Sequence, residues 1–195
     1  MRQLLLATRN AHKTGEFAEI LGDDFVVRDL SAEPDAPVVE ETGHTFAENA
    51  ILKAVTISKQ FPGLVVGDDS GLEVDALDGA PGIYSARYAG REAKDPDNIA
   101  RLLAEVAVHR GMEPLTARFR CVLALARNGE LLDTFEGAME GTIVETPRGS
   151  SGFGYDPVFQ PAGSGRTFAE LSAEEKNRIS HRARATELLR AALLT

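Results

Sequence analysis

The chain has 195 residues and a formal net charge of −9, with 21 Lys and Arg residues against 30 Asp and Glu residues. The length suits one domain with a sizeable hydrophobic core, and the acidic balance excludes sequence-independent binding to a nucleic-acid backbone. The single cysteine, Cys121, excludes an internal disulfide, and no apolar run has the length of a signal peptide or a transmembrane helix. We therefore expect a cytoplasmic protein that binds neither nucleic acid nor membrane.

The first part of the chain is predicted to alternate between strands and helices. Strands are expected over 3–7 and 24–30, and apolar residues at helical spacing predict a helix between them. A second helix begins at the capping box of Thr45 and Glu48. Asn49 and Lys53 follow four residues apart in that helix, so they share one of its faces.

A buried strand is predicted over 64–67, and it stops at Asp68, Asp69, Ser70 and Gly71. Ligands of open α/β folds bind beyond the carboxyl ends of strands, so these acids occupy a position that is usual for chemistry. Two adjacent aspartates repel each other unless a cation or a proton offsets their charge. A simple polar turn is an equally good interpretation of these four residues.

The second half of the chain continues the mixture of strands and helices. A helix is expected from Asp95-Pro96, with Asp95 as its cap, and Asn128-Gly129 predicts the turn of a hairpin. The other predicted elements are the hairpin strands 116–126 and 131–136, a strand over 141–144, and helices capped by Ser172 and Ser180. Strand–helix units combined with a hairpin predict an α/β fold with a mixed sheet.

A polar loop, Thr8-Arg9-Asn10-Ala11-His12-Lys13, connects the first strand to the first helix. The N-terminus of a helix offers free N–H groups and the positive end of the helix dipole, so this junction is a candidate anion site. Lys13 adds a cation that suits phosphate. The loop has no Gly-Lys-Ser/Thr sequence and is therefore not a P-loop, and an ordinary surface loop is the alternative.

Acidic residues recur at Glu40-Glu41, Asp68-Asp69 and Asp75, whereas no Cys and His residues have zinc-like spacing. Carboxylate oxygens suit Mg²⁺ or Mn²⁺, and Mg²⁺ usually completes its shell with water and substrate phosphates. A bound metal would let an acidic protein accept a polyphosphate. Solvated loop acids are the alternative for Glu40 and Glu41.

Two late segments carry the remaining candidates. Phe153 and Tyr155 lie among glycines beside Asp156, where an aromatic ring either stacks on a base or packs in the core. A basic cluster in the last helical segments is ordinarily a solvated helix face. Its members are Lys176, His181 and Arg182.

Six separate blocks of sequence, each occurring once, carry a resemblance to a known family. They are Thr8-x-Asn10-x-x-Lys13; Glu40-Glu41-Thr42-Gly43-x-Thr45-Phe46-x-Glu48-Asn49-Ala50-x-x-Lys53; Asp68-Asp69-Ser70-Gly71-Leu72; Gly79-Ala80-Pro81-Gly82-Ile83-Tyr84-Ser85-Ala86-Arg87; Gly152-Phe153-Gly154-Tyr155-Asp156-Pro157-x-Phe159; and Leu171, Glu175 and Lys176 with Ser180-His181-Arg182. In this order they closely resemble the inosine/xanthosine triphosphate pyrophosphatase family, which removes deaminated purine nucleotides.

The resemblance implies a fold and an activity. The implied fold is an elongated α/β structure in one domain, 1–195, with a mixed sheet, flanking helices and two lobes around a central cleft, and it forms a homodimer. The implied reaction is Mg²⁺-dependent hydrolysis of dITP, ITP, dXTP or XTP to the monophosphate and pyrophosphate, with Mn²⁺ as a substitute metal. A 6-oxo purine presents an acceptor where adenine presents an amino donor, so fixed donors in the pocket would select it.

The resemblance also implies the roles of particular residues. Asp69 would be the general base, assisted by Asp68 and Lys53, and Glu41 and Asp69 would hold the metal. Lys13 and Lys53 would counter the phosphate charge. The substrate-binding residues would be Thr8, Arg9, Asn10, Ala11, His12, Lys13, Ser70, Phe153 stacked on the purine, Gly154, Tyr155, Asp156, and the base-edge readers Lys176, His181 and Arg182.

Two positions depart from the family pattern. Arg9 stands where many members have glycine, and it either tightens phosphate binding or points into solvent. Gly67 stands where alanine is common. A related hydrolase that prefers another modified base is one alternative function. A nucleotide-binding module without catalysis is another, but it would be expected to lack the metal acids or the base, and all of these are present.

Overall fold

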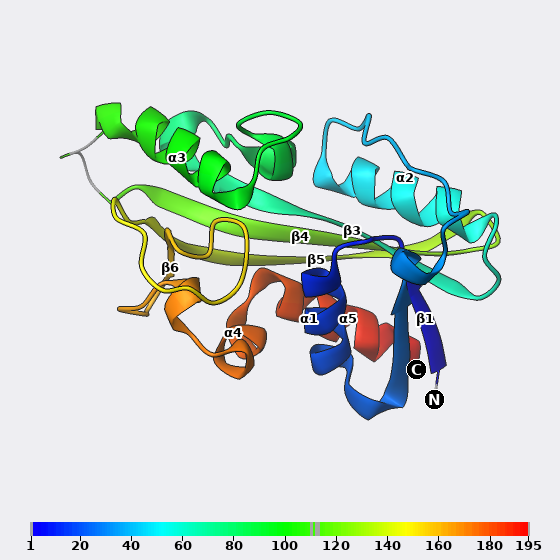
Figure 1. The fold of residues 1–195 in the computed structure, drawn as a ribbon. Helices are drawn as coiled ribbons and strands as arrows, with labels where there is room; N and C mark the ends of the chain where they lie inside the picture. The colour runs from blue at the N-terminus through cyan, green and yellow to red at the C-terminus, as the bar shows by residue number, and fades with distance from the viewer. Residues whose placement is uncertain (1, 110, 112–113, 195) are drawn as a thin grey trace. The chain divides into compact units, whose positions relative to one another are not determined.

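The computed structural model describes residues 2–109, 111 and 114–194 (Figure 1). Within these residues, six strands form one sheet in the order β2-β1-β3-β4-β5-β6. The strands are β1 (Arg2–Leu6), β2 (Phe25–Asp29), β3 (Leu64–Val74), β4 (Thr116–Arg127), β5 (Glu130–Ile143) and β6 (Phe159–Pro161). The α-helices are α1 (Ala11–Leu21), α2 (Phe46–Ser58), α3 (Asp95–Val106), α4 (Ala173–Ile179) and α5 (His181–Leu194).

The sheet is mixed, as the sequence predicts. β1 pairs in parallel with both β2 and β3, so that Leu5 lies opposite Arg28 on one side and Val65 on the other. β5 and β6 pair in antiparallel fashion. The turn between β4 and β5 has positive φ angles at Asn128 (54°) and Gly129 (82°), as the hairpin prediction requires.

The chain divides into two compact units, and β3, β4 and β5 each contribute residues to both of them. The first unit comprises Met1–Asp69, Cys121–Gly137 and His181–Thr195. Its core joins apolar residues of β1, α1, β4 and α5, with Leu6, Phe17, Cys121 and Leu189 fully buried. Cys121 is therefore a small core residue.

The second unit comprises Ser70–Arg120 and Ala138–Ser180. Three aromatic rings lie at its centre: the ring of Phe119 is 4.7 Å from that of Phe159 and 5.9 Å from that of Phe168, measured between centroids. The apolar face of α3, including Leu102, packs into the same core. Neither unit is a contiguous stretch of chain, and the expected single domain with two lobes stays a prediction.

Three predicted boundaries are wrong. β3 does not stop at Asp68 but continues through both aspartates to Val74, which also excludes the polar turn. β5 is one long strand that ends at Ile143 and includes residues 141–143 of the segment expected as a separate strand over 141–144. Asp95 is the first residue of α3 and not its cap, because Lys94 precedes it with extended backbone and donates its N–H to Asp97 (2.9 Å).

No helix in the described part of the chain is both long and apolar enough to cross a bilayer.

Candidate functional site

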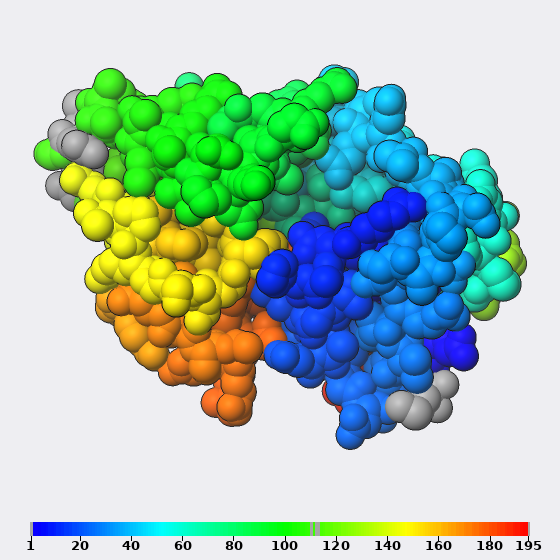
Figure 2. Space-filling model, viewed as in Figure 1, coloured from blue at the N-terminus to red at the C-terminus, as the bar shows by residue number. Residues whose placement is uncertain are grey.

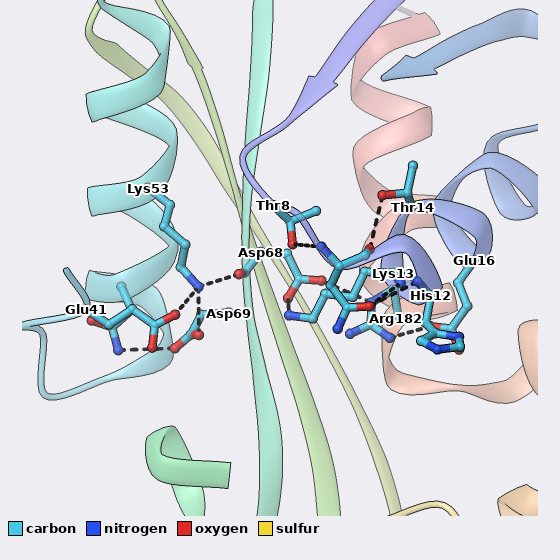
Figure 3. A network of polar contacts seen from close by, with 12 residues as sticks. Thr8, His12, Lys13, Thr14, Glu16, Glu41, Lys53, Asp68, Asp69 and Arg182 are labelled. Atoms are coloured by element: carbon cyan, nitrogen blue, oxygen red, sulfur yellow. Dashed lines mark hydrogen bonds and ion pairs between the residues drawn. The ribbon is translucent and has the colours of Figure 1, made fainter. Parts of the chain in front are cut away.

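Asp68 and Asp69 point to opposite sides of β3 and contact different cations (Figure 3). Successive side chains of a strand alternate between its two faces, so the continuation of β3 through this pair separates the carboxylates. Both are almost fully buried, with exposed fractions of 4% and 6%. The two repelling aspartates of the sequence are thus two distinct, individually paired acids.

The Asp68 carboxylate is held by basic residues in the first turns of α1 and α5. Its Oδ1 lies 2.9 Å from the Lys13 Nζ and its Oδ2 lies 3.0 Å from the Arg182 Nε. Arg182 also pairs with Glu16 of α1 and is only 2% exposed. Burial opposes ionisation, but Lys13 and Arg182 outweigh it and hold the pKa of Asp68 well below its usual range. Lys13 and Arg182 thus stabilise the ionised form of Asp68, and its expected assistance to Asp69 in catalysis stays a prediction.

The Asp69 carboxylate faces α2. The Lys53 Nζ donates to Asp69 Oδ1 (2.9 Å), to Glu41 Oε1 (2.8 Å) and to the backbone oxygen of Asp68 (2.7 Å). Burial raises the pKa of Asp69; Lys53 opposes this rise, whereas the charge of Glu41 adds to it. The pKa values of the two neighbouring carboxyls are therefore shifted in opposite directions, and the expected role of Asp69 as general base stays a prediction.

Asn49 completes the surroundings of Asp69. Its Nδ2 donates to Asp69 Oδ2 at 3.2 Å, and its side chain is fully buried. The sequence places Asn49 on the same helical face as Lys53, but that spacing gave it no role. Glu16, which pairs with Arg182, gave no signal in the sequence because its partner is 166 residues away.

The start of α2 orients both Asn49 and Lys53. Thr45 is the N-cap, and its hydroxyl oxygen accepts the N–H of Glu48 (3.1 Å). The Glu48 carboxylate accepts the N–H of His44 (2.6 Å), one residue before the position that a reciprocal capping box requires. The helix therefore begins where the sequence predicts. Of the two hydrogen bonds of a capping box, the one from the Glu48 N–H to the Thr45 hydroxyl is present, and the Glu48 carboxylate accepts from His44 instead of Thr45.

The loop before α1 is a turn in which three backbone N–H groups bond to the loop's own side chains. Thr8 Oγ1 accepts the N–H of Asn10 (3.1 Å), and Asn10 Oδ1 accepts those of His12 (3.0 Å) and Lys13 (3.3 Å). Ala11 and His12 are exposed. The N-terminal part of the chain is visible at the surface in the space-filling view (Figure 2, dark blue). What this loop offers an anion is the charge of Lys13 and the helix dipole more than free N–H groups. Its role as a phosphate cradle stays a prediction.

Arg9 is anchored to a neighbouring segment of the chain. Its guanidinium donates to the backbone oxygen of Ala36 at 2.8 Å. This contact ties the loop before α1 to the segment that follows β2. Arg9 therefore has a structural role, the bracing of this loop, in addition to the two expected alternatives of phosphate binding and solvent exposure.

A second group of predicted site residues lies together in the second unit. The Lys176 Nζ contacts Asp156 Oδ2 (2.6 Å) and lies 5.0 Å from the centroid of the Phe153 ring. Asp156 Oδ2 also accepts the N–H of Phe153 (3.0 Å). A cation, a carboxylate and a partly buried aromatic ring therefore share one spot, which suits the binding of a polar aromatic group.

The glycine-rich loop around Phe153 is fixed from two sides. Asp95, at the start of α3, accepts the N–H of Gly154 (2.6 Å). Tyr155 is buried and donates its hydroxyl to the backbone oxygen of Ser85 (2.9 Å), and burial raises the pKa of that hydroxyl. Tyr155 therefore supports the loop from inside the core.

The basic cluster of the sequence is not a solvated helix face. Lys176, His181 and Arg182 are all buried. Lys176 belongs to the second unit, whereas His181 and Arg182 begin α5 in the first. Their expected reading of a base edge stays a prediction, as does a substrate contact by Ser70, which is partly buried in β3.

A divalent cation fits the donor set on the α2 side of β3. Glu41 and Asp69 converge on one ammonium group, that of Lys53, so the three side chains carry a net negative charge. Carboxylate oxygens are the ligands that Mg²⁺ prefers, and one or two are enough when water and phosphates complete its shell. Within the described residues, no group of three or more His, Cys, Asp and Glu side chains is arranged around a metal position.

The sequence model of the Ham1 family matches residues 4–192. The chain belongs to the Ham1 family. Two relatives, both called dITP/XTP pyrophosphatase, come from Geobacillus kaustophilus (52% identical over 186 residues, 95% of this chain and 91% of the relative) and Bacillus subtilis (48% identical over 192 residues, 97% and 96%). A solved Ham1 structure from Coxiella burnetii superimposes with a TM-score of 0.89 at 41% identity, covering 100% of this chain and 99% of that one. The family resemblance and the mixed α/β fold are thereby confirmed.

Proposed function

We propose that this chain hydrolyses dITP, ITP, dXTP and XTP to the nucleoside monophosphate and pyrophosphate. The observation that carries the proposal is the split of the adjacent acids on β3, with Asp68 locked by Lys13 and Arg182 and Asp69 kept beside Lys53 with a raised pKa. The names of the two Ham1 relatives, dITP/XTP pyrophosphatases that are 52% and 48% identical in sequence to this chain, support the substrate class.

In this proposal Asp69 accepts a proton from the water that attacks the α-phosphorus, and pyrophosphate leaves. Lys53 stays charged, because Asp69 and Glu41 raise its pKa against the effect of burial. Lys13 and Lys53 then stabilise the negative charge of the phosphates. Phosphoryl transfer depends mainly on such positioning and charge neutralisation, and these are the contributions proposed for Lys13 and Lys53.

Glu41 and Asp69 are the residues that would hold Mg²⁺, with Mn²⁺ as a substitute. When bound, the metal supplies charge neutralisation of the phosphates and polarisation of a phosphoryl oxygen. The net negative charge that these two acids retain beside Lys53 supports this assignment.

Binding of the base is assigned to the second group, with Phe153 stacking on the purine. The contact of Lys176 with Asp156 and its position 5.0 Å from the Phe153 ring support this role, because a charged donor there can meet the 6-oxygen of a deaminated purine. His181 and Arg182 are proposed to help read the base edge, and the loop 8–13 to hold the phosphates.

A panel of nucleoside triphosphates assayed for pyrophosphate release with Mg²⁺ tests the proposal. We expect dITP, ITP and XTP to be preferred over ATP, GTP and the pyrimidine nucleotides. In H₂¹⁸O the label should enter the monophosphate, because water attacks the α-phosphorus. Release of pyrophosphate from a modified pyrimidine alone would favour the alternative hydrolase, and no release from any nucleotide would leave only a binding module.

We further propose that two copies of the chain form a homodimer. The start of β5 supports an association surface, because residues 130–134 are all exposed although they belong to a strand. Leu131 and Leu132 lie within this segment, with 42% and 45% exposed. Contact with a second copy would remove the apolar surface of these two leucines from water, and this gain supports their assignment to the dimer contact.

A further inference from the structure

The fully buried side chain of Asn49 makes two hydrogen bonds of opposite polarity. Its Oδ1 accepts the N–H of Gly43 (2.8 Å), and its Nδ2 donates to Asp69 Oδ2 (3.2 Å). A backbone N–H can only donate, so the amide oxygen must face Gly43 and the NH₂ group must face Asp69. The orientation of this amide is therefore fixed by chemistry.

The two contacts of Asn49 reach both acids of the proposed metal site. Asp69 receives the Asn49 amide on Oδ2 and the Lys53 ammonium on Oδ1, so two residues one helical turn apart on α2 fix its rotation. Gly43 lies two residues after Glu41, whose carboxylate accepts from the same Lys53. Asn49 thus ties the segment that carries Glu41 directly to Asp69.

We propose that Asn49 is a positioning residue for the reaction: it orients the Asp69 carboxylate and holds the Glu41 segment in register with it. This inference rests on the proposed pyrophosphatase function. An amide suits the task better than another lysine, because it donates a hydrogen bond without cancelling charge. The negative charge that Glu41 and Asp69 retain beside Lys53 stays available to a divalent cation.

Gly43 is required for the same arrangement of hydrogen bonds around Asn49. A Cβ atom at this position would lie 2.7 Å from Asn49 Oδ1 and 2.7 Å from the Glu48 Cβ, closer than side chains pack. The segment can therefore approach the Asn49 amide only with glycine here. Gly43→Ala should displace the amide without removing any of its hydrogen-bonding groups.

The test compares Asn49 with a matched residue elsewhere in the chain. Asn98 is also buried, accepts the N–H of Ala89 (2.7 Å) and donates to the backbone oxygen of Ala86 (3.3 Å), but it contacts no predicted site residue through these bonds. Asn49→Asp keeps the acceptor for Gly43 and replaces the donor that faces Asp69. Asn98→Asp makes the same exchange of atoms without touching a candidate site residue.

We expect Asn49→Asp and Gly43→Ala to lower kcat about 10–100-fold with little change in KM, and Asn98→Asp to keep the kcat of the wild type. Mn²⁺ titrated alone and followed by electron paramagnetic resonance should bind Asn49→Ala about tenfold more weakly than it binds Asn98→Ala. Thermal unfolding of each variant identifies losses that come from misfolding.

Two results would overturn this role for Asn49. One is an Asn49→Asp enzyme as active as wild type. This variant still accepts the Gly43 N–H but no longer donates to Asp69, so full activity would show that the donated hydrogen bond is not needed. The other is an Asn49→Ala protein that matches Asn98→Ala in both kcat and Mn²⁺ affinity, and this comparison decides the matter if Asn49→Asp does not fold. The wild-type assay is separate: an inactive wild type rejects the proposed function, whereas the Mn²⁺ comparison still reports on Asn49.

Discussion

At the scale of single residues, the sharpest claim is that two adjacent aspartates have different tasks. Asp69→Asn keeps the size and the burial of the side chain but removes its ability to take a proton. We expect turnover to fall about 10²–10⁴-fold while nucleotide binding remains measurable. Pyrophosphate release and calorimetric binding of ITP measure the two quantities separately. Near-normal turnover in this variant would remove Asp69 as the base.

The ion pairs around Asp68 lead to a second prediction, which concerns the stability of the fold. Arg182 is buried between Asp68 and Glu16, so Arg182→Met leaves two carboxylates without their guanidinium. We expect the free energy of unfolding to fall by about 3–5 kcal/mol, as when one partner of a buried ion pair is removed. Unfolding in urea measures the loss.

A control for this prediction lies on the same helix. Arg190 pairs with Asp24 at the surface, where both side chains are well exposed. Arg190→Met should cost about 0–1 kcal/mol, because solvent screens such pairs. Equal losses at Arg182 and Arg190 would contradict the view that Arg182 is part of a buried charge network.

At the scale of elements, the contact between β3 and α2 positions the site. A Cβ atom at Gly67 would lie 2.1 Å from the backbone oxygen of Ala50 and 2.8 Å from the backbone nitrogen of Ala54. Gly67→Ala must therefore push α2 away. We expect a loss of about 1–3 kcal/mol in urea unfolding, together with lower kcat, because α2 carries Lys53.

Gly15 provides the control for Gly67. It lies within α1, and a Cβ atom there would meet nothing within 4 Å. Gly15→Ala should be neutral or stabilise the protein by up to about 1 kcal/mol, because alanine is the better helix former. If Gly67→Ala were equally harmless, β3 and α2 would not be in the close contact described above.

The start of α4 gives a pH-dependent prediction. Glu175 pairs with Arg166 (2.7 Å) and accepts the N–H of Ser172 (2.8 Å), and these contacts lower its pKa to about 2. Because the folded pKa lies below the unfolded one, the stabilisation is complete above pH ~4.3 and is lost as the pH falls towards 2. A carbon-detected titration of the Glu175 carboxyl should show this pKa, and Arg166→Gln should raise it. A midpoint near the ordinary glutamate value in the wild type would contradict the capping role.

Most of the elements, the start of α2 and the turn between β4 and β5 followed from the sequence because they depend on local signals, such as the Thr45 cap and the Asn128-Gly129 pair. The continuation of β3 did not follow. Two aspartates look like the end of a strand, and only Lys13, Lys53 and Arg182, which come from three different helices, make their burial tolerable. The same limit applies to Arg182, for which a solvated helix face is the ordinary expectation: the partners that bury it are 114 and 166 residues away.

At the scale of the whole molecule, net charge and the exposed leucines act against each other. Each copy carries −9, so two copies repel at low ionic strength, while Leu131 and Leu132 gain by leaving water. Salt screens the repulsion and leaves the apolar contact intact. We therefore expect dimers that become tighter, not weaker, as the ionic strength rises.

Sedimentation velocity at several salt concentrations tests this expectation. The wild type should sediment with twice the 21.0 kDa mass of one chain, and the double variant Leu131→Glu, Leu132→Glu should sediment as a single chain. Because both side chains are already exposed in one copy, the substitutions should leave the thermal unfolding of the monomer nearly unchanged. A double variant that remains dimeric would move the association surface away from the start of β5, and a wild type that is monomeric at every salt concentration would reject the homodimer.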